Sequence, residues 1–539
     1  MKHVVFDVSS IVALLVDSEK NEDIKRLLDL DKQDVSCWIS AGSLPSIQYI
    51  FLRTIEENGG SQQEGVRTFQ ELFTALLNRV SILSNLGFRQ NELIAKARDL
   101  EGAQIALAAD QLHGEKIIVT DDPSFDTLGL IESKTALEAM AWLGCQDKNT
   151  QIPFVDLAGQ QDALRPQLEK GIFTVLKHGK YILGPEVQEL EGVLSDYVGV
   201  ENAIGVASGT DALLAVLMAW GVGPGDAVFT TPFTFIATSE VISLLGATPV
   251  FVDIDPRTYN IDPDKLALAV QAVKANDPTI YPLPRFTGCE ALQPKAVIPV
   301  DLFGLPADYD PIMKIAEQNK LFVLEDAAQG LGGVYKNHKS GSFGHAAATS
   351  FFPAKPLGCY GDGGAVMTND QGLADEIRSI RVHGKGKDKY DNVRVGLNAR
   401  LHTVQAAFLL AKFGVFSQEV AGRQRVAEKY SEILKGCAAL TVPFVPDFAQ
   451  SAWAQYTLYY QNDRVITQGA LQASNIPSAV YYGRSLHLQP VYKGLGYEKG
   501  DLPVSEISSE HVLSLPMSPN LSDAALDHII SGVLDAVED

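Results

Sequence analysis

The sequence predicts an α/β protein with a smaller domain ahead of a larger one. Three observations favour this class. The 539 residues exceed one ordinary domain of about 150 residues. The chain changes character near residue 150, where the polar stretch GCQDKNTQIP (144–153) is typical of a linker. From Ile152 onward, apolar strands alternate with amphipathic helices, and this alternation predicts a mostly parallel sheet covered by helices.

Composition excludes several classes of protein. Hydrophobic residues make up 46% and charged residues 20% of the chain, as in globular proteins. No window holds the roughly 18 uninterrupted apolar residues that a membrane span requires. Asp7 interrupts the first apolar run, which favours a buried strand over a secretion signal and predicts a cytoplasmic protein. The net charge of −22 leaves no basic surface for a nucleic acid.

The first 145 residues form the smaller predicted domain. Residues 3–16 and 116–120 are expected as strands, and residues 65–80 and 91–112 as helices. A linker is expected over 146–151. The five cysteines of the whole chain are scattered and never spaced as CxxC, so reduced thiols are expected and a metal cluster is not.

The larger part is expected to contain two domains. Residues 152–415 carry the strand–helix alternation and should form a large α/β domain. A long helix over 417–436, followed by short strands, predicts a small C-terminal α+β domain over 416–539.

Polar residues follow two of the predicted strands. Ser208, Gly209 and Thr210 open a helix, where free backbone N–H groups favour a phosphate, although such a cap alone is usually only a cap. Asp326 ends the apolar segment LFVLEDAAQG (321–330). A buried carboxylate requires a positive partner; capping the next helix is the alternative interpretation.

A lysine in an unusual setting is the strongest single signal. Lys355 lies between two prolines in the glycine-rich segment TSFFPAKPLGCYGDGGAV (349–366), which suits neither a helix nor a strand. A lysine fixed in such a turn can be desolvated, and lysine is the residue that forms Schiff bases with carbonyl compounds. Asn398 and Arg400 precede another apolar helix and alone indicate only a helix start.

Together these segments resemble the DegT/DnrJ/StrS family of sugar aminotransferases. The matching motifs span residues 152 to about 535 in the family's order: FVDLAGQ, YILGPEVQELE, GVASGTDALL, TTPFTFIATSE, FVDIDPRTYNID, IPVDLFG, EDAAQ, SFFPAKPLGCYGDGGA, RVHG, GLNARL and LHLQP. The resemblance implies the type I fold of pyridoxal-5'-phosphate (PLP) enzymes and transfer of an amino group to a keto sugar attached to a nucleotide. Dehydratases of the same fold replace the Schiff-base lysine with histidine, so Lys355 favours transamination.

The resemblance also implies roles for individual residues. Lys355 would form the internal aldimine with PLP, and Asp326 would keep the pyridine nitrogen protonated. Gln329 would bind the phenolic oxygen and Phe235 would stack on the ring, with core packing as the alternative for Phe235. The implied phosphate ligands are Gly209, Thr210, Asp211, Ser350 and, from the second subunit of a homodimer, Asn398.

Substrate residues follow from the same resemblance. Arg400, Tyr481, Tyr482 and His487 match positions where the family meets the nucleotide sugar, with a core role left open for His487. Tyr481 stands where many relatives have His. The motifs look most like the branch that aminates UDP-2-acetamido-3-keto-glucuronate for surface polysaccharides, with glutamate as donor. A branch acting on 4-keto sugars remains the alternative.

Residues 1–145 resemble a PIN-like domain, a nuclease fold with acidic residues around divalent metal. The positions that match the acidic set are Asp7, Asp99, Glu101 and Asp122. Ser46 and Gly102 stand where relatives often have acids. The incomplete set favours a scaffold or interaction module over an active ribonuclease, which stays the alternative.

Overall fold

A computed structural model describes residues 2–6, 35–40, 81–83, 115–119, 133–134, 152–285, 291–388, 390–461 and 464–538. The chain divides into two compact units, Met1–Thr150 and Gln151–Asp539. No helix in the described ranges is long and apolar enough to cross a membrane.

The first unit contains a five-stranded sheet of order β3-β2-β1-β4-β5. Its strands are β1 (Lys2–Phe6), β2 (Val35–Ser40), β3 (Ser81–Leu83), β4 (Glu115–Val119) and β5 (Ser133–Lys134). Every neighbouring pair is parallel, which is the pattern of an α/β unit. The acidic candidates Asp7, Asp99, Glu101 and Asp122, like the helices expected at 65–80 and 91–112, lie outside the described residues.

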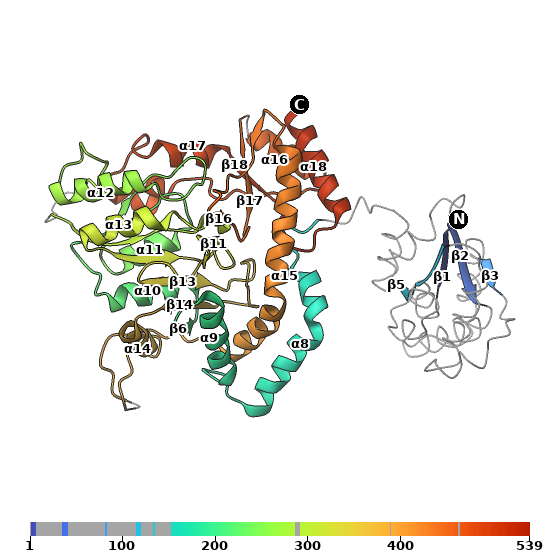
Figure 1. Cartoon of the computed structure of the whole chain (residues 1–539), viewed down its shortest axis with the longest axis horizontal. Coiled ribbons are helices and arrows are strands. Elements are labelled where there is room, and N and C mark those ends of the chain that lie inside the picture. The colour runs from blue at the N-terminus through green and yellow to red at the C-terminus, as the bar shows by residue number, and fades with distance from the viewer. Residues whose placement is uncertain are drawn as a thin grey trace, which may run out of the picture. The chain divides into compact units, whose positions relative to one another are not determined.

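A seven-stranded mixed sheet forms the centre of the second unit (Figure 1), in the order β6-β14-β13-β10-β9-β7-β8. The strands are β6 (Asn202–Val206), β7 (Asp226–Thr230), β8 (Thr248–Phe251), β9 (Gln293–Ile298), β10 (Phe322–Asp326), β13 (Ala346–Ser350) and β14 (Gly364–Thr368). The five strands from β13 to β8 run parallel, and β14 is antiparallel to both of its neighbours. The expected mostly parallel sheet is confirmed.

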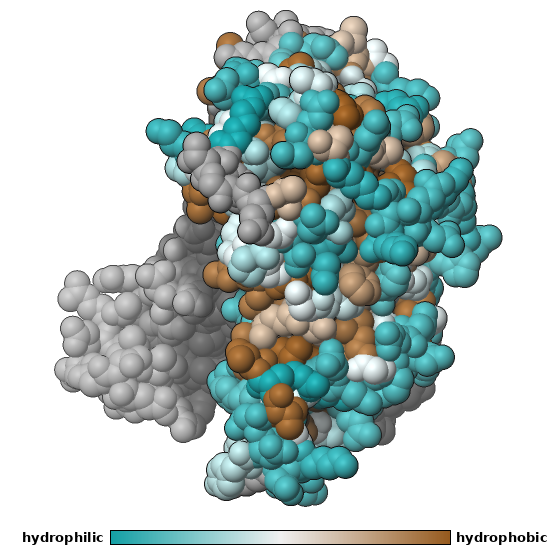
Figure 2. Space-filling model, turned by 90° about the vertical axis from the view of Figure 1, so that its left-hand side faces the viewer, coloured by the Kyte–Doolittle hydropathy of each residue, from teal (hydrophilic) through white to brown (hydrophobic). Residues whose placement is uncertain are grey.

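Helices cover both faces of this sheet. α12 (Pro263–Ala275) and α13 (Tyr309–Asn319) bury one apolar cluster against it. α10 (Gly209–Ala219), α11 (Ala237–Leu244) and α14 (Gln371–Ile380) bury a second cluster with the other face. Burial on both sides explains why the strands are apolar along their whole length. On the side shown in Figure 2, hydrophilic side chains predominate and hydrophobic ones lie between them in smaller groups, as on ordinary globular surfaces.

The long helix α15 (Thr403–Leu434) joins this α/β layer to the C-terminal part (Figure 1). α8 (Leu157–His178) and α9 (Pro185–Val198) pack beside it. A separate helix over 417–436 was the expectation; the structure has one helix of 32 residues, and the predicted boundary at 415/416 lies inside it. Gly414 costs a helix only about 1 kcal/mol, and no proline interrupts the segment.

The C-terminal part packs around the second half of α15. β15 (Leu440–Thr441), β17 (Tyr456–Tyr460) and β18 (Val512–Leu515) form an antiparallel sheet, and α16 (Arg464–Ala473) and α18 (Asp523–Glu538) complete its apolar core. A small sheet of β11 (Val334–Tyr335), β12 (His338–Lys339) and β16 (Ala449–Gln450) links it to the larger layer, and α17 (Pro503–His511) precedes β18. The expected α+β arrangement is observed here.

Candidate active site

Asp326 ends β10 at the carboxyl edge of the parallel strands, where α/β sheets bind ligands. Its carboxylate is 4% exposed. Thr238 Oγ1 donates a hydrogen bond to it over 2.8 Å, and the backbone N–H of Ala328 donates another over 3.2 Å. Burial raises the pKa of Asp326, while these hydrogen bonds and the charge of Lys355 act in the opposite direction. A cation beside it would stabilise its ionised form.

Lys355 supplies that cation. It lies in the turn between β13 and β14, where its N–H donates to the Phe352 carbonyl over 2.9 Å. The side chain is half-buried. Desolvation lowers the pKa of Lys355, and the Asp326 charge partly offsets this. The fold therefore brings together a buried carboxylate and a desolvated amine that are 29 residues apart in the chain.

Gln329 and Tyr482 lie next to this pair. Gln329 Nε2 donates to the Tyr482 hydroxyl over 3.2 Å, and Gln329 Oε1 accepts from the Phe303 N–H over 2.6 Å. The Phe235 side chain is 55% exposed, with its ring centroid 6.5 Å from that of Tyr482. This exposure disfavours the alternative that Phe235 is packed in the core and leaves its face open to a planar ring.

The helix α10 presents its N-terminus at the same edge of the sheet. Ser208 caps it by accepting the Asp211 N–H over 3.0 Å, and burial raises the pKa of Asp211. A Cβ added at Gly209 would lie 2.7 Å from the Ser350 Cβ. Backbone, helix end and Ser350 thus approach one another closely, which only glycine at 209 allows, and a helix N-terminus of this kind binds anions.

Arg400 lies beside the end of β6, the strand that precedes α10, and Asn398 lies two residues before Arg400 in the chain. Arg400 pairs with Val206 and Asn398 with Val382 through isolated bridges. Arg400 Nη2 donates to Asn398 Oδ1, and the Asn398 side chain is exposed. Arg400 Nε has no hydrogen-bond partner in the described ranges.

The remaining predicted substrate residues have different surroundings. The half-buried Tyr481 ring lies against Phe154 at a centroid distance of 6.2 Å. His487 is 1% exposed and its Nε2 lies 3.1 Å from Glu506 Oε1. The His487 ring lies near the rings of Phe251 and Tyr497, which belong to the protein interior. The structure therefore places His487 in the core, one of the two roles left open for it.

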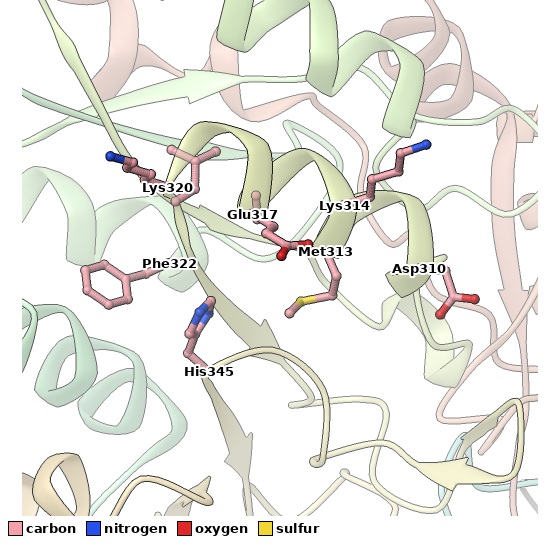
Figure 3. A pocket seen from close by; sticks show the side chains of 9 residues that line it. Asp310, Met313, Lys314, Glu317, Lys320, Phe322 and His345 are labelled. Atoms are coloured by element: carbon pink, nitrogen blue, oxygen red, sulfur yellow. The ribbon is translucent and has the colours of Figure 1, made fainter.

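Cavities also lie away from these residues. One of about 650 Å³ is lined by α13 residues, Phe322 and His345 (Figure 3). Phe322 opens β10, so this cavity is at the opposite end of that strand from Asp326. Glu317 and Met313 extend from α13 toward His345 in this view, whereas Lys314 and Lys320 point away. This cavity is therefore not part of the site around Asp326 and Lys355.

These residues fit PLP on chemical grounds. Asp326 offers a buried anion for a protonated pyridine nitrogen, Lys355 an amine for a carbonyl carbon, and Gln329 an amide for a phenolic oxygen. The glycine cradle at the start of α10 suits the phosphate. Within the described ranges no three His, Cys, Asp or Glu residues come together as metal ligands.

The fold and this set of residues define a PLP-dependent transferase of the type I fold. Residues 164–534 match the DegT/DnrJ/EryC1/StrS aminotransferase family, and the chain belongs to that family. It is therefore a PLP-dependent aminotransferase of the kind that acts on sugar nucleotides.

Individual relatives cover the same part of the chain. UDP-2-acetamido-2-deoxy-3-oxo-D-glucuronate aminotransferase of Pseudomonas aeruginosa is 46% identical over 382 residues, 71% of this chain and 99% of the relative. UDP-N-acetyl-3-dehydro-alpha-D-glucosamine 3-aminotransferase of Acidithiobacillus ferrooxidans is 39% identical over 71% of this chain and 97% of its own. The crystal structure of a family aminotransferase from Brucella abortus, 48% identical, covers 72% of this chain and 100% of its own with a TM-score of 0.67.

Sequence reasoning missed Thr238 as a ligand of Asp326. Thr238 lies in the motif TTPFTFIATSE, but on a helix following a different strand, and no spacing rule connects it with a residue 88 positions later. The Gln329–Tyr482 hydrogen bond was missed for the same reason, because it joins segments 153 residues apart.

Proposed function

We propose that the acceptor is the 3-keto group of a UDP-linked 2-acetamido-3-keto-glucuronate, aminated for surface-polysaccharide synthesis. The Pseudomonas aeruginosa and Acidithiobacillus ferrooxidans relatives, both named for 3-oxo or 3-dehydro UDP sugars, support the position of the ketone and the nucleotide. The 46% identity to the first of them is the observation that carries the proposal. A 4-keto sugar nucleotide is the alternative acceptor.

Each residue near the cofactor has a defined task in this proposal. Asp326 holds a proton on the pyridine nitrogen, and Gln329 binds the phenolic oxygen. Phe235 covers the ring face. Gly209, Thr210, Asp211 and Ser350 bind the phosphate at the N-terminus of α10. When bound, PLP supplies the electron sink that makes the donor's α-hydrogen acidic.

Lys355 moves the proton. Its uncharged Nζ takes the proton from the α-carbon of the donor amino acid as a general base, and in the opposite half-reaction it returns a proton to the sugar carbon that receives the amino group. The lowered pKa of Lys355 supports this role, because it increases the fraction of the amine that can act as a base near neutral pH.

Arg400 recognises the substrate carboxylate. Its planar, permanently charged guanidinium offers a bidentate fork to the hexuronate carboxylate, and in the donor half-reaction to the side chain of glutamate. Its hydrogen-bond partner is the Asn398 amide rather than an acid, and Nε is unpartnered within the described ranges. This favours a substrate role over an internal ion pair. Tyr481 and Tyr482 line the sugar side of the site.

The active unit is a homodimer in which Asn398 reaches the phosphate of the partner subunit's cofactor. The exposed position of the Asn398 side chain supports this arrangement.

The first unit is a PIN-like domain whose acidic set is incomplete, and it serves as a scaffold or interaction module in a cytoplasmic protein. Its all-parallel sheet is compatible with that proposal, and an active ribonuclease is the alternative.

A direct substrate comparison tests the acceptor. Purified protein is given glutamate and either the 3-keto uronate or a 4-keto-6-deoxy sugar, each on UDP, and the amino sugar is quantified. We expect preference for the 3-keto uronate. Arg400→Ala should lower kcat/KM for it by about one to two orders of magnitude, the cost of a charged hydrogen-bonded pair. Preference for the 4-keto compound with Arg400→Ala unimpaired would reject this substrate and leave the aminotransferase in place.

A further inference from the structure

One lysine outside the candidate active site is buried and has no hydrogen-bond partner in the described ranges. Lys412, on α15, is 1% exposed, and its Nζ donates no hydrogen bond in the described ranges. This ammonium lies over the ring of Tyr360, whose centroid is 3.9 Å away. An unpaired buried charge lowers the stability of a fold, so the position of Lys412 requires an explanation.

Tyr360 belongs to the turn that carries Lys355. Three residues of α15 contact this tyrosine. Gln405 Oε1 accepts the Tyr360 N–H over 3.0 Å while Gln405 Nε2 donates to the Tyr360 carbonyl over 3.2 Å. The Phe408 ring meets the Tyr360 ring edge-on at 5.0 Å. Residues 405, 408 and 412 are spaced i, i+3, i+7 and therefore share one face of the helix, with Lys412 as the third contact.

The charged and titratable groups around Lys412 give its ammonium no hydrogen bond within the described ranges, whereas the Tyr360 ring is in direct contact with it. Glu419, two turns further along the same helix, raises the pKa of Lys412 through its negative charge. Glu419 is engaged by Gln160 Nε2 over 2.6 Å, and burial raises the pKa of the Cys359 thiol to about 11, so this thiol is uncharged. The Tyr360 hydroxyl is also uncharged, because burial raises its pKa. Desolvation outweighs the carboxylate and lowers the pKa of Lys412 to about 8.

We propose that Lys412 is a positioning residue of the amino-transfer site, whose ammonium binds the face of Tyr360 and thereby fixes the turn that presents Lys355. The inference rests on the proposed role of Lys355. The cation–π contact is desolvated, which is the setting in which such contacts are strongest. The same turn also holds Cys359, whose Sγ lies 3.0 and 3.2 Å from the Phe351 and Gly361 carbonyl oxygens, so a displacement at Tyr360 would also move the residues next to it in the turn.

A purely structural lysine and a positioning lysine predict opposite effects on stability. Lys412→Met keeps the length of the side chain and removes the buried charge. If Lys412 positions the turn, this variant should unfold at the same or a higher temperature than the native holoenzyme, because a buried ionic group replaced by an apolar one is often neutral or stabilising. If Lys412 only supports the fold, the unfolding temperature should fall.

The experiment compares four variants of the full-length holoenzyme: Lys412→Met, Lys412→Arg, Tyr360→Leu and Tyr360→Phe. The readouts are the unfolding temperature, kcat, and the pH at which the absorption spectrum of the lysine-bound cofactor changes. We expect Lys412→Met and Tyr360→Leu to shift that pH alike and to lower kcat about ten- to a hundredfold, the scale of a misplaced reacting group. Lys412→Arg, which retains the charge, and Tyr360→Phe, which retains the ring face, should stay near the native values.

Three results would overturn the inference. Lys412→Met could leave the spectrum and kcat unchanged, it could fold poorly or unfold at a lower temperature, or its defect could be absent from Tyr360→Leu. Lys355→Ala separates this failure from that of the proposed function. An inactive Lys355→Ala beside a native-like Lys412→Met rejects only the role of Lys412, whereas an active Lys355→Ala rejects the proposed mechanism itself.

Discussion

At the scale of single residues, the site depends on one electrostatic pair. Burial disfavours the charged forms of both Asp326 and Lys355, because it raises the pKa of the acid and lowers that of the amine. Each partly relieves the other, and Thr238 orients the carboxylate. A buried acid beside a desolvated amine is a costly arrangement that a chemical role explains better than stability does.

The role of Lys355 leads to a first variant. Lys355→Ala should keep PLP only non-covalently and lose turnover, because the amine that takes the donor's α-proton is removed. The expected readouts are loss of cofactor on gel filtration and absence of amino-sugar product. Lys314→Ala, an exposed lysine on α13, is the matched control and should behave as the native protein. Normal turnover by Lys355→Ala would reject the mechanism.

At the scale of elements, the sequence predicted where strands lie better than their directions and the lengths of the helices between them. The β10 and β13 segments were identifiable because each apolar run ends in polar residues, and parallel strands bring such ends to one edge. The antiparallel direction of β14 was not predicted, because an apolar strand has the same pattern in either direction. The continuity of α15 was also missed, since Gly414 was compatible with a break between two helices.

The contacts made by α15 explain why the rest of the site could not be derived. Gln405, Phe408 and Lys412 are ordinary helix residues in the sequence, and only the fold sets them against Tyr360. His487 shows the reverse case. It lies in a motif of the family, yet its Glu506 partner and its burial place it in the core. Pairings across long sequence separations depend on tertiary packing, which local patterns do not contain.

At the scale of the whole molecule, the proposed assembly can be tested by mixing variants. Lys355→Ala and Asn398→Ala are each expected to be inactive or strongly impaired, because the first lacks the amine and the second a phosphate ligand for its partner. If Asn398 acts in trans, mixed dimers contain one site with both native residues. Dissociating and remixing the two variants should then restore up to about one quarter of native activity, the share of such sites after random pairing of subunits.

The controls for this experiment are each variant remixed with itself, which should remain inactive. Sedimentation should show a dimer as the smallest active species. A fully active monomer, or no recovery despite demonstrated exchange of subunits, would contradict a shared site.

The division of the chain into two units supports a final prediction about the first of them. The family match begins at residue 164, and the Brucella abortus structure is covered completely by 72% of this chain. We therefore expect amino transfer to need no residue of the first unit. Deleting residues 1–148 should leave kcat and KM for amino transfer within about twofold of native, because distant and independent sites contribute additively. The variant is assayed beside the full chain with the same substrates, and its fold is checked by thermal unfolding. Loss of activity in a folded variant would mean that the first unit contributes to the site.

The full chain is also incubated with RNA and Mg²⁺ or Mn²⁺, where no cleavage is expected, because Ser46 and Gly102 supply no carboxylate for a hard divalent cation. Cleavage that depends on metal and disappears in Asp7→Asn would instead make this unit a second enzyme.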